Sequence, residues 1–355
     1  MDILPSSEVV NGVAIRRCWG PSFGRGSFYG RFLDMASFSI LAVVRMMFAP
    51  RVETVVFLTN PPLFSLLGAL MKRIRKERFV YILMDIYPDI AIHAGVLREG
   101  AAVTRFLRRV SRVALRGADR VVVLGDDMRE VAIRAGAASE KVVVIRNWAD
   151  HEKINPLPKE SNRLRREWGL NGKFIVEYSG NMGISHFFDD ILAVAEELEE
   201  YDDIRFVFIG GGMQYREVKS YVASKKLTNV IFTPYQEKSM LSLSLSAGDV
   251  HFVSLRPGFE GLVVPSKAYG VMAAGRPMIY QGDGKGEIAK MVRREEIGFV
   301  VGPGDRAGLR DAILALYKDK EMGTRMGEMS RRALEAKYSS SVGLAQYSRV
   351  LAGKD

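Results

Sequence analysis

Residues 174–183 read FIVEYSGNMG, a mostly apolar run that ends in a turn containing Gly180 and Gly183. An apolar, β-branched run of this length predicts a strand that is covered on both faces. The small residues behind it allow backbone amides to approach a phosphate at the start of a helix, which we expect near Ser185. A tight turn without any ligand explains this stretch equally well, because a short pair of glycines is a weak signal.

Nine further runs of the same kind alternate with stretches of helical period. This alternation predicts an α/β protein with two doubly wound, Rossmann-like parallel sheets that face each other across a cleft. The break falls at residues 149–162, where two prolines and several charges interrupt the pattern. We therefore expect domains at 1–148 and 163–328 and a terminal helix within 329–355. The ten predicted strands are 53–58, 78–84, 120–124, 141–145, 174–178, 204–209, 229–232, 249–253, 277–280 and 298–301.

The 355 residues are 48% hydrophobic and 26% charged, which excludes a disordered chain, a collagen-like repeat and a disulfide scaffold. Cys18 is the only cysteine, so no disulfide can form within the chain, and a reducing compartment is expected. The net charge of +10 is uneven: residues 1–150 carry 22 basic against 14 acidic side chains, and residues 151–355 carry 29 against 27. A basic half favours a polyanionic partner, whether nucleic acid, a membrane surface or a phosphorylated substrate.

Basic and apolar residues occur together in the first half. Five arginines between residues 104 and 116 share one face of a predicted helix, and a second basic cluster lies at 72–78. An apolar stretch at 32–48 has ten uncharged residues between Asp34 and Arg45, too few to span a bilayer. We expect an anionic lipid surface as the partner, with a solvated helix face as the alternative. The members are Arg105, Arg108, Arg109, Arg112 and Arg116 in the first cluster, and Lys72, Arg73, Arg75, Lys76 and Arg78 in the second.

Other kinds of site are less favoured. The chain has no recognition-helix, RNA-binding or zinc motif, and no aromatic residues interleaved with the arginines, so nucleic acid is not expected. No metal site is expected either, because the four histidines are scattered without a paired Cys or Glu spacing. The absence of a Gly-x-Ser-x-Gly elbow argues against a serine hydrolase.

Two further predicted strands end in residues suited to a ligand. Gly210, Gly211 and Gly212 follow the run at 204–209, where glycines permit close backbone approach. Tyr235 follows the next run and could stack on a nucleobase, although an ordinary packed aromatic is the more common outcome.

The densest set of polar groups lies at residues 256–277, which read RPGFEGLVVPSKAYGVMAAGRP. A helix is predicted to begin at Ser266 and Lys267 and to end before the Gly-Arg-Pro. Arg256 and Lys267 could both face a diphosphate, and Glu260 could bind sugar hydroxyls. The alternative is a structural helix with solvated ends, which the density of converging polar groups makes less favoured.

Together these segments resemble the retaining, metal-independent glycosyltransferases of family 4, which have the GT-B fold. Within that family the likeness is greatest to bacterial fucosyl- and N-acetylfucosaminyl-transferase-like enzymes that build surface polysaccharides on a polyprenyl carrier. The resemblance implies a nucleotide-sugar in the second domain, an acceptor held by the first, and a terminal helix that crosses back to the first. It implies no cofactor and no metal. The segments that carry it are 59–62, 85–89, 118–121, 147–150, 179–183 and 260–277.

The resemblance also assigns roles to residues. Glu260 is expected to orient the donor sugar and Asp85 to act on the acceptor side, and these are the two predicted catalytic residues. The enzyme would transfer a sugar to a polyprenyl-diphosphate-linked saccharide, as a cytoplasmic protein peripheral to the inner membrane. The predicted donor-binding residues are Gly180, Asn181, Met182, Gly183, His186, Gly210, Gly211, Gly212, Tyr235, Arg256, Gly261, Leu262, Pro265, Ser266 and Lys267.

Some positions depart from the family pattern. The family usually sets an Arg and, five residues on, a Lys against the donor diphosphate, where this chain has Asn181 and His186. Arg256 or Lys267 would then supply the missing charge, or His186 would have to be protonated. The other departures are Gly270, in place of a second glutamate, and Met84, in place of a histidine.

The start of the chain departs most from the family pattern. The family opens with a strand and a glycine-rich turn, so about two βα units are expected to be missing from the first domain. Either Met1 is a misassigned start, or the chain is a shortened and inactive copy. Two other functions stay open: a nucleotide-sugar 2-epimerase of the same fold, and a non-catalytic partner in polysaccharide assembly.

Overall fold

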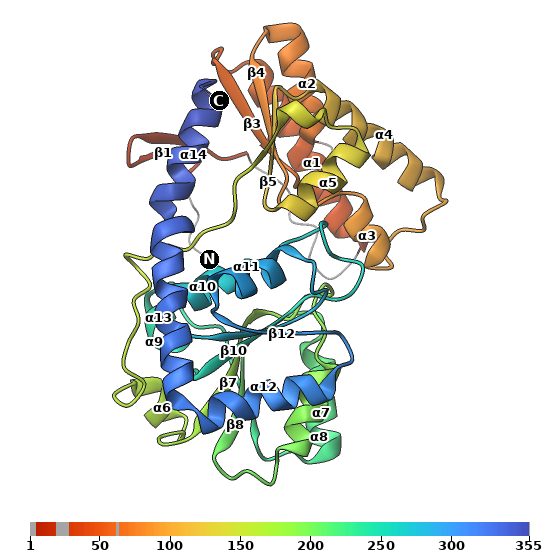
Figure 1. Ribbon diagram of the computed structural model, residues 1–355. Helices are drawn as coiled ribbons and strands as arrows, with labels where there is room; N and C mark the ends of the chain where they lie inside the picture. The colour runs from red at the N-terminus through yellow and green to blue at the C-terminus, as the bar shows by residue number, and fades with distance from the viewer. Residues whose placement is uncertain (1–4, 19–27, 62–63, 355) are drawn as a thin grey trace.

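The computed structural model of the chain consists of two lobes, each built on a parallel sheet (Figure 1). It describes residues 5–18, 28–61 and 64–354. All ten predicted strands are present, which confirms the α/β class. A short antiparallel hairpin, β1 (Ser7–Val10) with β2 (Val13–Arg16), precedes them. The sequence pattern does not predict this hairpin, because its four-residue strands are mostly exposed.

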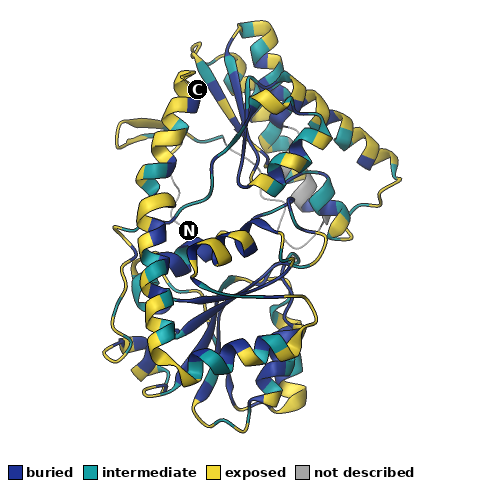
Figure 2. Cartoon of the chain, viewed as in Figure 1, coloured by how far each residue is buried: buried dark blue, intermediate teal, exposed yellow. Residues whose placement is uncertain are grey.

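The N-terminal lobe has one four-stranded sheet, with its strands in chain order and all parallel. The strands are β3 (Thr54–Leu58), β4 (Arg78–Ile82), β5 (Arg120–Val123) and β6 (Val142–Val144). The inner strands β4 and β5 are buried runs, as expected for a parallel sheet, whereas the edge strand β3 leaves Val56 and Leu58 43% and 50% exposed (Figure 2). The helices are α1 (Phe28–Met47), α2 (Phe64–Arg75), α3 (Asp89–His93), α4 (Ala102–Gly117) and α5 (Asp126–Ala135).

The C-terminal lobe has a six-stranded parallel sheet in the order β12-β11-β10-β7-β8-β9. The chain builds outward from β7 to one side and then returns to its other side at β10, so the strand order reverses between these two strands. The strands are β7 (Phe174–Asn181), β8 (Ile204–Gly211), β9 (Val230–Thr233), β10 (Val250–Ser254), β11 (Met278–Gln281) and β12 (Gly298–Val301). The helices are α6 (Arg163–Glu167), α7 (Asp189–Glu197), α8 (Tyr215–Lys225), α9 (Leu241–Leu245), α10 (Lys267–Ala273), α11 (Glu287–Glu295) and α12 (Arg306–Lys318).

Two helices, rather than the single one predicted, end the chain: α13 (Lys320–Lys337) and α14 (Ser340–Ala352). The break falls where the Tyr338 hydroxyl donates to Glu295 at the end of α11, 3.3 Å away. From there α14 runs along the N-terminal lobe (Figure 1). The Tyr347 ring packs on Trp148 at 5.6 Å, and Arg78 donates to the Val350 carbonyl oxygen at 2.6 Å. The terminal segment therefore ties the two lobes together.

The second basic cluster has largely structural roles. Lys72 pairs with Asp119 at 2.6 Å. Arg75 pairs with the buried Glu77 at 2.8 Å and donates to three carbonyls at the end of α1, those of Met46, Met47 and Ala49. Arg78 is partly buried where it donates to α14. The exposed members of this cluster are therefore Arg73 and Lys76.

The exposed side of α4 combines charge with apolar surface. Four of its five arginines are exposed, while Arg108 forms ion pairs with Asp89 at 2.8 Å and Glu99 at 3.0 Å. Val103, Phe106 and Val113 are 50%, 57% and 48% exposed on the same helix. We call these three residues with Arg105, Arg109, Arg112 and Arg116 the α4 face. Among the described residues, no helix is long and apolar enough to cross a bilayer.

Candidate functional site

A cavity of about 630 Å³ lies at the carboxyl ends of β7 and β8. Doubly wound sheets bind ligands at this end, where the strand order reverses. Two other cavities, of about 510 and 690 Å³, lie around Phe174 and Asp249 at the amino ends of the strands, and no predicted site residue lines them. The predicted residues on the wall of the first cavity are Gly180, Asn181, His186, Tyr235, Pro265, Ser266 and Lys267.

The glycine turn is shaped by the packing of two strand ends. β7 continues through Gly180, which pairs with Gly210, and the following helix begins at Asp189 rather than near Ser185. A Cβ atom on Gly210 would lie 2.3 Å from the Gly180 carbonyl oxygen, and one on Gly212 would lie 2.5 Å from Asn181 Oδ1. Gly210 and Gly212 are therefore explained by backbone packing, without a ligand.

Gly180 has a different environment. Its φ of +134° lies where a side chain is strained, and a Cβ atom there would lie 3.5 Å from Lys267 Cε and 3.9 Å from its Nζ. The missing side chain thus leaves the Lys267 amine open toward the strand end.

Lys267 is the first residue of α10 and reaches across to β7. Its Nζ contacts the Tyr178 hydroxyl, lies 3.9 Å from the centre of that ring, and is 3.2 Å from His186 Nε2. Among the described residues no carboxylate forms an ion pair with it. Burial lowers the pKa of Lys267 well below its usual range.

His186 takes a defined tautomer. Its Nδ1 lies 2.5 Å from the Ser254 carbonyl oxygen, which can only accept, so Nδ1 carries the proton and Nε2 faces Lys267 as an acceptor. Burial, followed by the Lys267 charge, lowers the pKa of His186 to about 3. His186 is therefore neutral and does not supply the missing cation.

Tyr235 offers a flat aromatic surface to the cavity. Its side chain is 59% exposed, with the ring edge against Gly210 and Gly211. Its hydroxyl donates to the Gly211 carbonyl oxygen at 3.0 Å, which fixes the ring. One face of this ring is thus available for stacking.

Arg256 and Glu260 are not on the cavity wall. Arg256 donates to Gln214 Oε1 at 3.2 Å. Glu260 folds back to accept from the Gly258 amide at 2.7 Å, and its other oxygen is buried without a hydrogen-bond partner in the part of the chain that the structure describes. Gln214, which we did not predict, donates to the Gly183 and His186 carbonyls at 2.5 and 2.9 Å. No local pattern marks it, because its role depends on how β7 and α8 meet.

Other predicted residues belong to the seam between the lobes or to the core. The Leu262 carbonyl accepts from the Ile86 amide at 2.9 Å, and Asp85 forms an isolated bridge with Val263. A Cβ atom on Gly261 would lie 2.8 Å from Val131 of α5. Burial raises the pKa of Asp85. Met182 is fully buried in the core of the C-terminal lobe.

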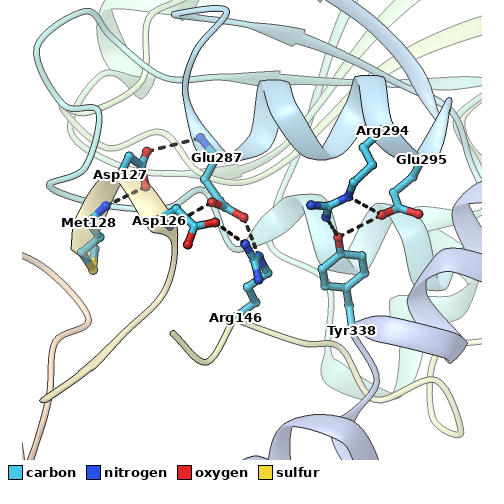
Figure 3. Close-up of polar contacts among 8 residues, drawn as sticks. All are labelled: Asp126, Asp127, Met128, Arg146, Glu287, Arg294, Glu295 and Tyr338. Carbon is cyan, nitrogen blue, oxygen red and sulfur yellow. Dashed lines mark hydrogen bonds and ion pairs between the residues drawn. The ribbon is translucent and has the colours of Figure 1, made fainter. Parts of the chain in front are cut away.

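A second contact closes the seam between α5 and α11 (Figure 3). The Asp127 carboxylate accepts from the Glu287 amide at 3.2 Å, and the Glu287 carboxylate accepts from the Asp126 amide at 3.1 Å. Arg146 donates to both Glu287, at 2.6 Å, and Asp126, at 2.7 Å. Each helix start is thus capped by an acid from the other lobe.

Comparisons with known proteins agree with this architecture. Residues 4–148 match the family described as a glycosyl transferase 4-like domain, and residues 173–319 match the family of glycosyl transferases group 1. WbjE of Pseudomonas aeruginosa, described as a probable glycosyltransferase, is 29% identical over 84% of this chain and 74% of its own length. WcaI of Escherichia coli K12, named for glycosyl transfer in colanic acid biosynthesis, is 25% identical over 72% of this chain and 65% of its own length.

Solved structures show the same fold. Anabaena HepE in complex with UDP has a TM-score of 0.73 at 16% identity, covering 91% of this chain and 84% of HepE. At that identity the likeness concerns the fold alone, which is the GT-B arrangement of two facing Rossmann-like domains.

Proposed function

Because the chain belongs to the glycosyltransferases, whose family descriptions match both of its lobes, we propose that its cavity at the ends of β7 and β8 binds a nucleotide-sugar donor. The observation that carries this proposal is Lys267, a lysine on the cavity wall that has no carboxylate partner among the described residues. A diphosphate would supply the counter-charge. Crystal complexes of HepE with UDP and with UDP-glucose support a nucleoside diphosphate sugar as the class of donor.

The remaining wall of the cavity suits the rest of such a donor. Tyr235 would stack on the base, since every nucleobase offers a flat π surface. Lys267 would stabilise the negative charge that develops on the departing diphosphate, which is a large term when it acts in a water-poor site. We propose metal-independent transfer with retention, as in the family 4 enzymes that the sequence resembles.

We further propose that the N-terminal lobe holds a polyprenyl-diphosphate-linked saccharide at an anionic membrane surface. The α4 face supports this proposal, because exposed arginines beside apolar side chains match the chemistry of a lipid interface. Asp85, at the seam below β4, would contact the acceptor, and Glu260 would orient the donor sugar once the loop that carries it moves. The involvement of WcaI in colanic acid biosynthesis supports surface polysaccharide as the product class.

Calorimetric titration of the full chain with UDP tests the donor site. We expect binding by the natural protein and binding at least about tenfold weaker by Lys267→Met, because a hydrogen bond to a charged partner contributes about 1.5–3 kcal/mol. Lys318→Met, which removes an exposed lysine on α12, is the matched control and should bind UDP normally.

Turnover is tested with a panel of nucleotide-sugars and a polyprenyl-diphosphate-linked saccharide. Release of nucleoside diphosphate that depends on the acceptor supports the proposal. Formation of an epimer of the sugar without acceptor, or failure to bind any nucleoside diphosphate, would contradict it.

A further inference from the structure

Lys267 is held by two hydrogen-bonded relays, each of which ends in a backbone carbonyl. In the first, Nζ contacts the Tyr178 hydroxyl, which donates to the Asn181 carbonyl oxygen at 2.7 Å. In the second, Nζ donates to His186 Nε2 at 3.2 Å, and His186 Nδ1 donates to the Ser254 carbonyl oxygen at 2.5 Å. We call Tyr178 and His186 the Lys267 seat.

The seat fixes the direction of the amine. The neutral amine has two N–H donors, which the seat accepts, and a lone pair; the ammonium has a third N–H in place of the lone pair. This third position has no partner among the described residues and belongs to a side chain on the cavity wall. Since Gly180 carries no side chain, nothing on the strand end fills the space next to this N–H.

The seat is also electrically neutral. His186 is confined to one neutral tautomer by the Ser254 carbonyl, and the Tyr178 hydroxyl donates a hydrogen bond to the Asn181 carbonyl oxygen. The titratable groups that face Nζ are thus Tyr178 on β7 and His186 in the loop behind it, with Tyr235 beyond Tyr178. Burial raises the pKa of Tyr178 and lowers that of His186, which keeps both uncharged at neutral pH.

Building on the donor site proposed above, we propose that His186 and Tyr178 are positioning residues that present a single, uncompensated lysine to the diphosphate, and that the diphosphate and a proton bind together. The amine is partly buried between two neutral acceptors and has no carboxylate partner among the described residues, so the empty site favours its neutral form. A bound diphosphate supplies the counter-charge and favours the ammonium. The site would therefore take up a proton from solvent when the diphosphate arrives and return it when the diphosphate leaves.

This arrangement accounts for the histidine at position 186. Its Nε2 lies 3.2 Å from the Lys267 amine, so a lysine there would set two ammonium groups side by side. A neutral acceptor removes that repulsion and orients the one cation that remains. His186 thus acts on the donor through Lys267.

Proton uptake distinguishes this seat from a merely structural cluster. UDP is titrated into the full chain at pH 8 in buffers of different ionisation enthalpy, from which the number of protons bound per UDP is obtained. At this pH the terminal phosphate, with a second pKa of about 6, is already ionised and takes up none. We expect uptake that approaches one proton in the natural protein. Lys267→Arg should bind UDP without uptake, because guanidinium stays charged.

The His186 variants test positioning. His186→Leu should weaken UDP binding about tenfold and shift its pH dependence to lower pH, because the ammonium loses one acceptor, whereas His186→Gln, whose side-chain oxygen can accept from Lys267, should recover most of the affinity. UDP binding by the natural protein without proton uptake, or an unchanged affinity and pH profile in a folded His186→Leu, would overturn this inference and leave the donor site standing. Failure of the natural protein to bind UDP or any other nucleoside diphosphate would overturn both.

Discussion

Asp127 and Glu287 cap each other's helices across the seam between the lobes. The Asp127 carboxylate accepts from the first amide of α11, while the Glu287 carboxylate accepts from the first amide of α5. Glu287 is 5% exposed and also holds Arg146 (Figure 3). The two lobes are therefore joined by hydrogen bonds that centre on one buried carboxylate, Glu287, and that form only when the lobes are together.

Removal of Glu287 from this contact should destabilise the protein. Glu287→Ala leaves the Asp126 amide without its acceptor and removes one of the two carboxylates that bind Arg146, so it should lower the free energy of unfolding by about 2 kcal/mol. Glu328→Ala, which removes an exposed ion pair with Arg332, should change it by less than about 0.5 kcal/mol. Thermal unfolding of both variants measures the difference, and equal effects would show that the seam contributes no stability.

Two neighbouring arginines on α2 should differ sharply. Arg75→Ala leaves the buried Glu77 carboxylate uncompensated and frees three carbonyls at the end of α1, so it should cost about 3 kcal/mol of stability. Arg73→Ala removes an exposed side chain and should cost less than about 0.5 kcal/mol. Urea unfolding compares them. A costly Arg73→Ala or a harmless Arg75→Ala would refute the structural role given to this cluster.

Acid should destabilise the C-terminal lobe through His251. This side chain is 1% exposed, its Nε2 donates to the Leu245 carbonyl, and burial lowers its pKa from 6.5 to about 4. The unfolded chain therefore binds more protons at His251 between these values, so the stability that this residue contributes is complete above pH 6.5 and is lost as the pH falls toward 4. Burial raises the pKa of Glu177, 3.9 Å from His251 Nδ1, and this acts in the opposite direction. The test is therefore the difference between the natural protein and His251→Gln in unfolding curves from pH 7 to 4, in which the natural protein should lose more stability. Parallel curves would contradict this role of His251.

Tyr235 should bind through its ring rather than its hydroxyl. Tyr235→Ala should weaken UDP binding by about 1–3 kcal/mol, the usual range for a base stacked on an aromatic side chain. Tyr235→Phe keeps the ring and should stay within about threefold of the natural affinity. Calorimetry at one pH compares the two. Equal losses in both variants would indicate that the hydroxyl, which binds the Gly211 carbonyl, is the part that matters.

The α4 face should bind anionic lipid. Replacing Arg105, Arg109, Arg112 and Arg116 by Gln should abolish sedimentation with phosphatidylglycerol vesicles, since each basic residue near such a surface contributes about 1 kcal/mol. The matched control is Arg216→Gln with Lys219→Gln, which removes two exposed charges from α8 in the other lobe and should leave sedimentation unchanged. Binding that survives loss of all four arginines would exclude this face.

The sequence predicts the fold better than it predicts the site. The strands could be predicted because each is a short, mostly apolar run in the sequence, and the resemblance then indicated the cleft. Lys267 and His186 were both predicted to bind the donor, but their contact with each other and with Tyr178 was not, since Tyr178 reads as a strand residue. Their contact depends on α10 from residue 267 meeting β7 from residue 174, about 90 positions earlier. Pairings of that separation leave no local pattern.

The glycines also show that tertiary contacts cannot be predicted from the local sequence pattern. Gly180 and Gly210 look alike in sequence, since each follows an apolar run. In the structure Gly210 is required by the approach of the Gly180 carbonyl, whereas Gly180 leaves the Lys267 amine uncovered. Gly261 lies in a segment whose polar residues predict a ligand-binding loop. In the structure it packs against Val131 and the Asp127 carbonyl at the seam. Which glycines face a ligand depends on the tertiary neighbours.

The most direct test of the donor site is a crystal structure of the full chain with UDP. We expect the diphosphate to lie in the cavity beside Gly180, with a phosphate oxygen within hydrogen-bonding distance of Lys267 Nζ while that amine keeps its contacts with Tyr178 and His186. UDP bound elsewhere, or bound in this cavity with Lys267 turned away from both phosphates, would contradict it.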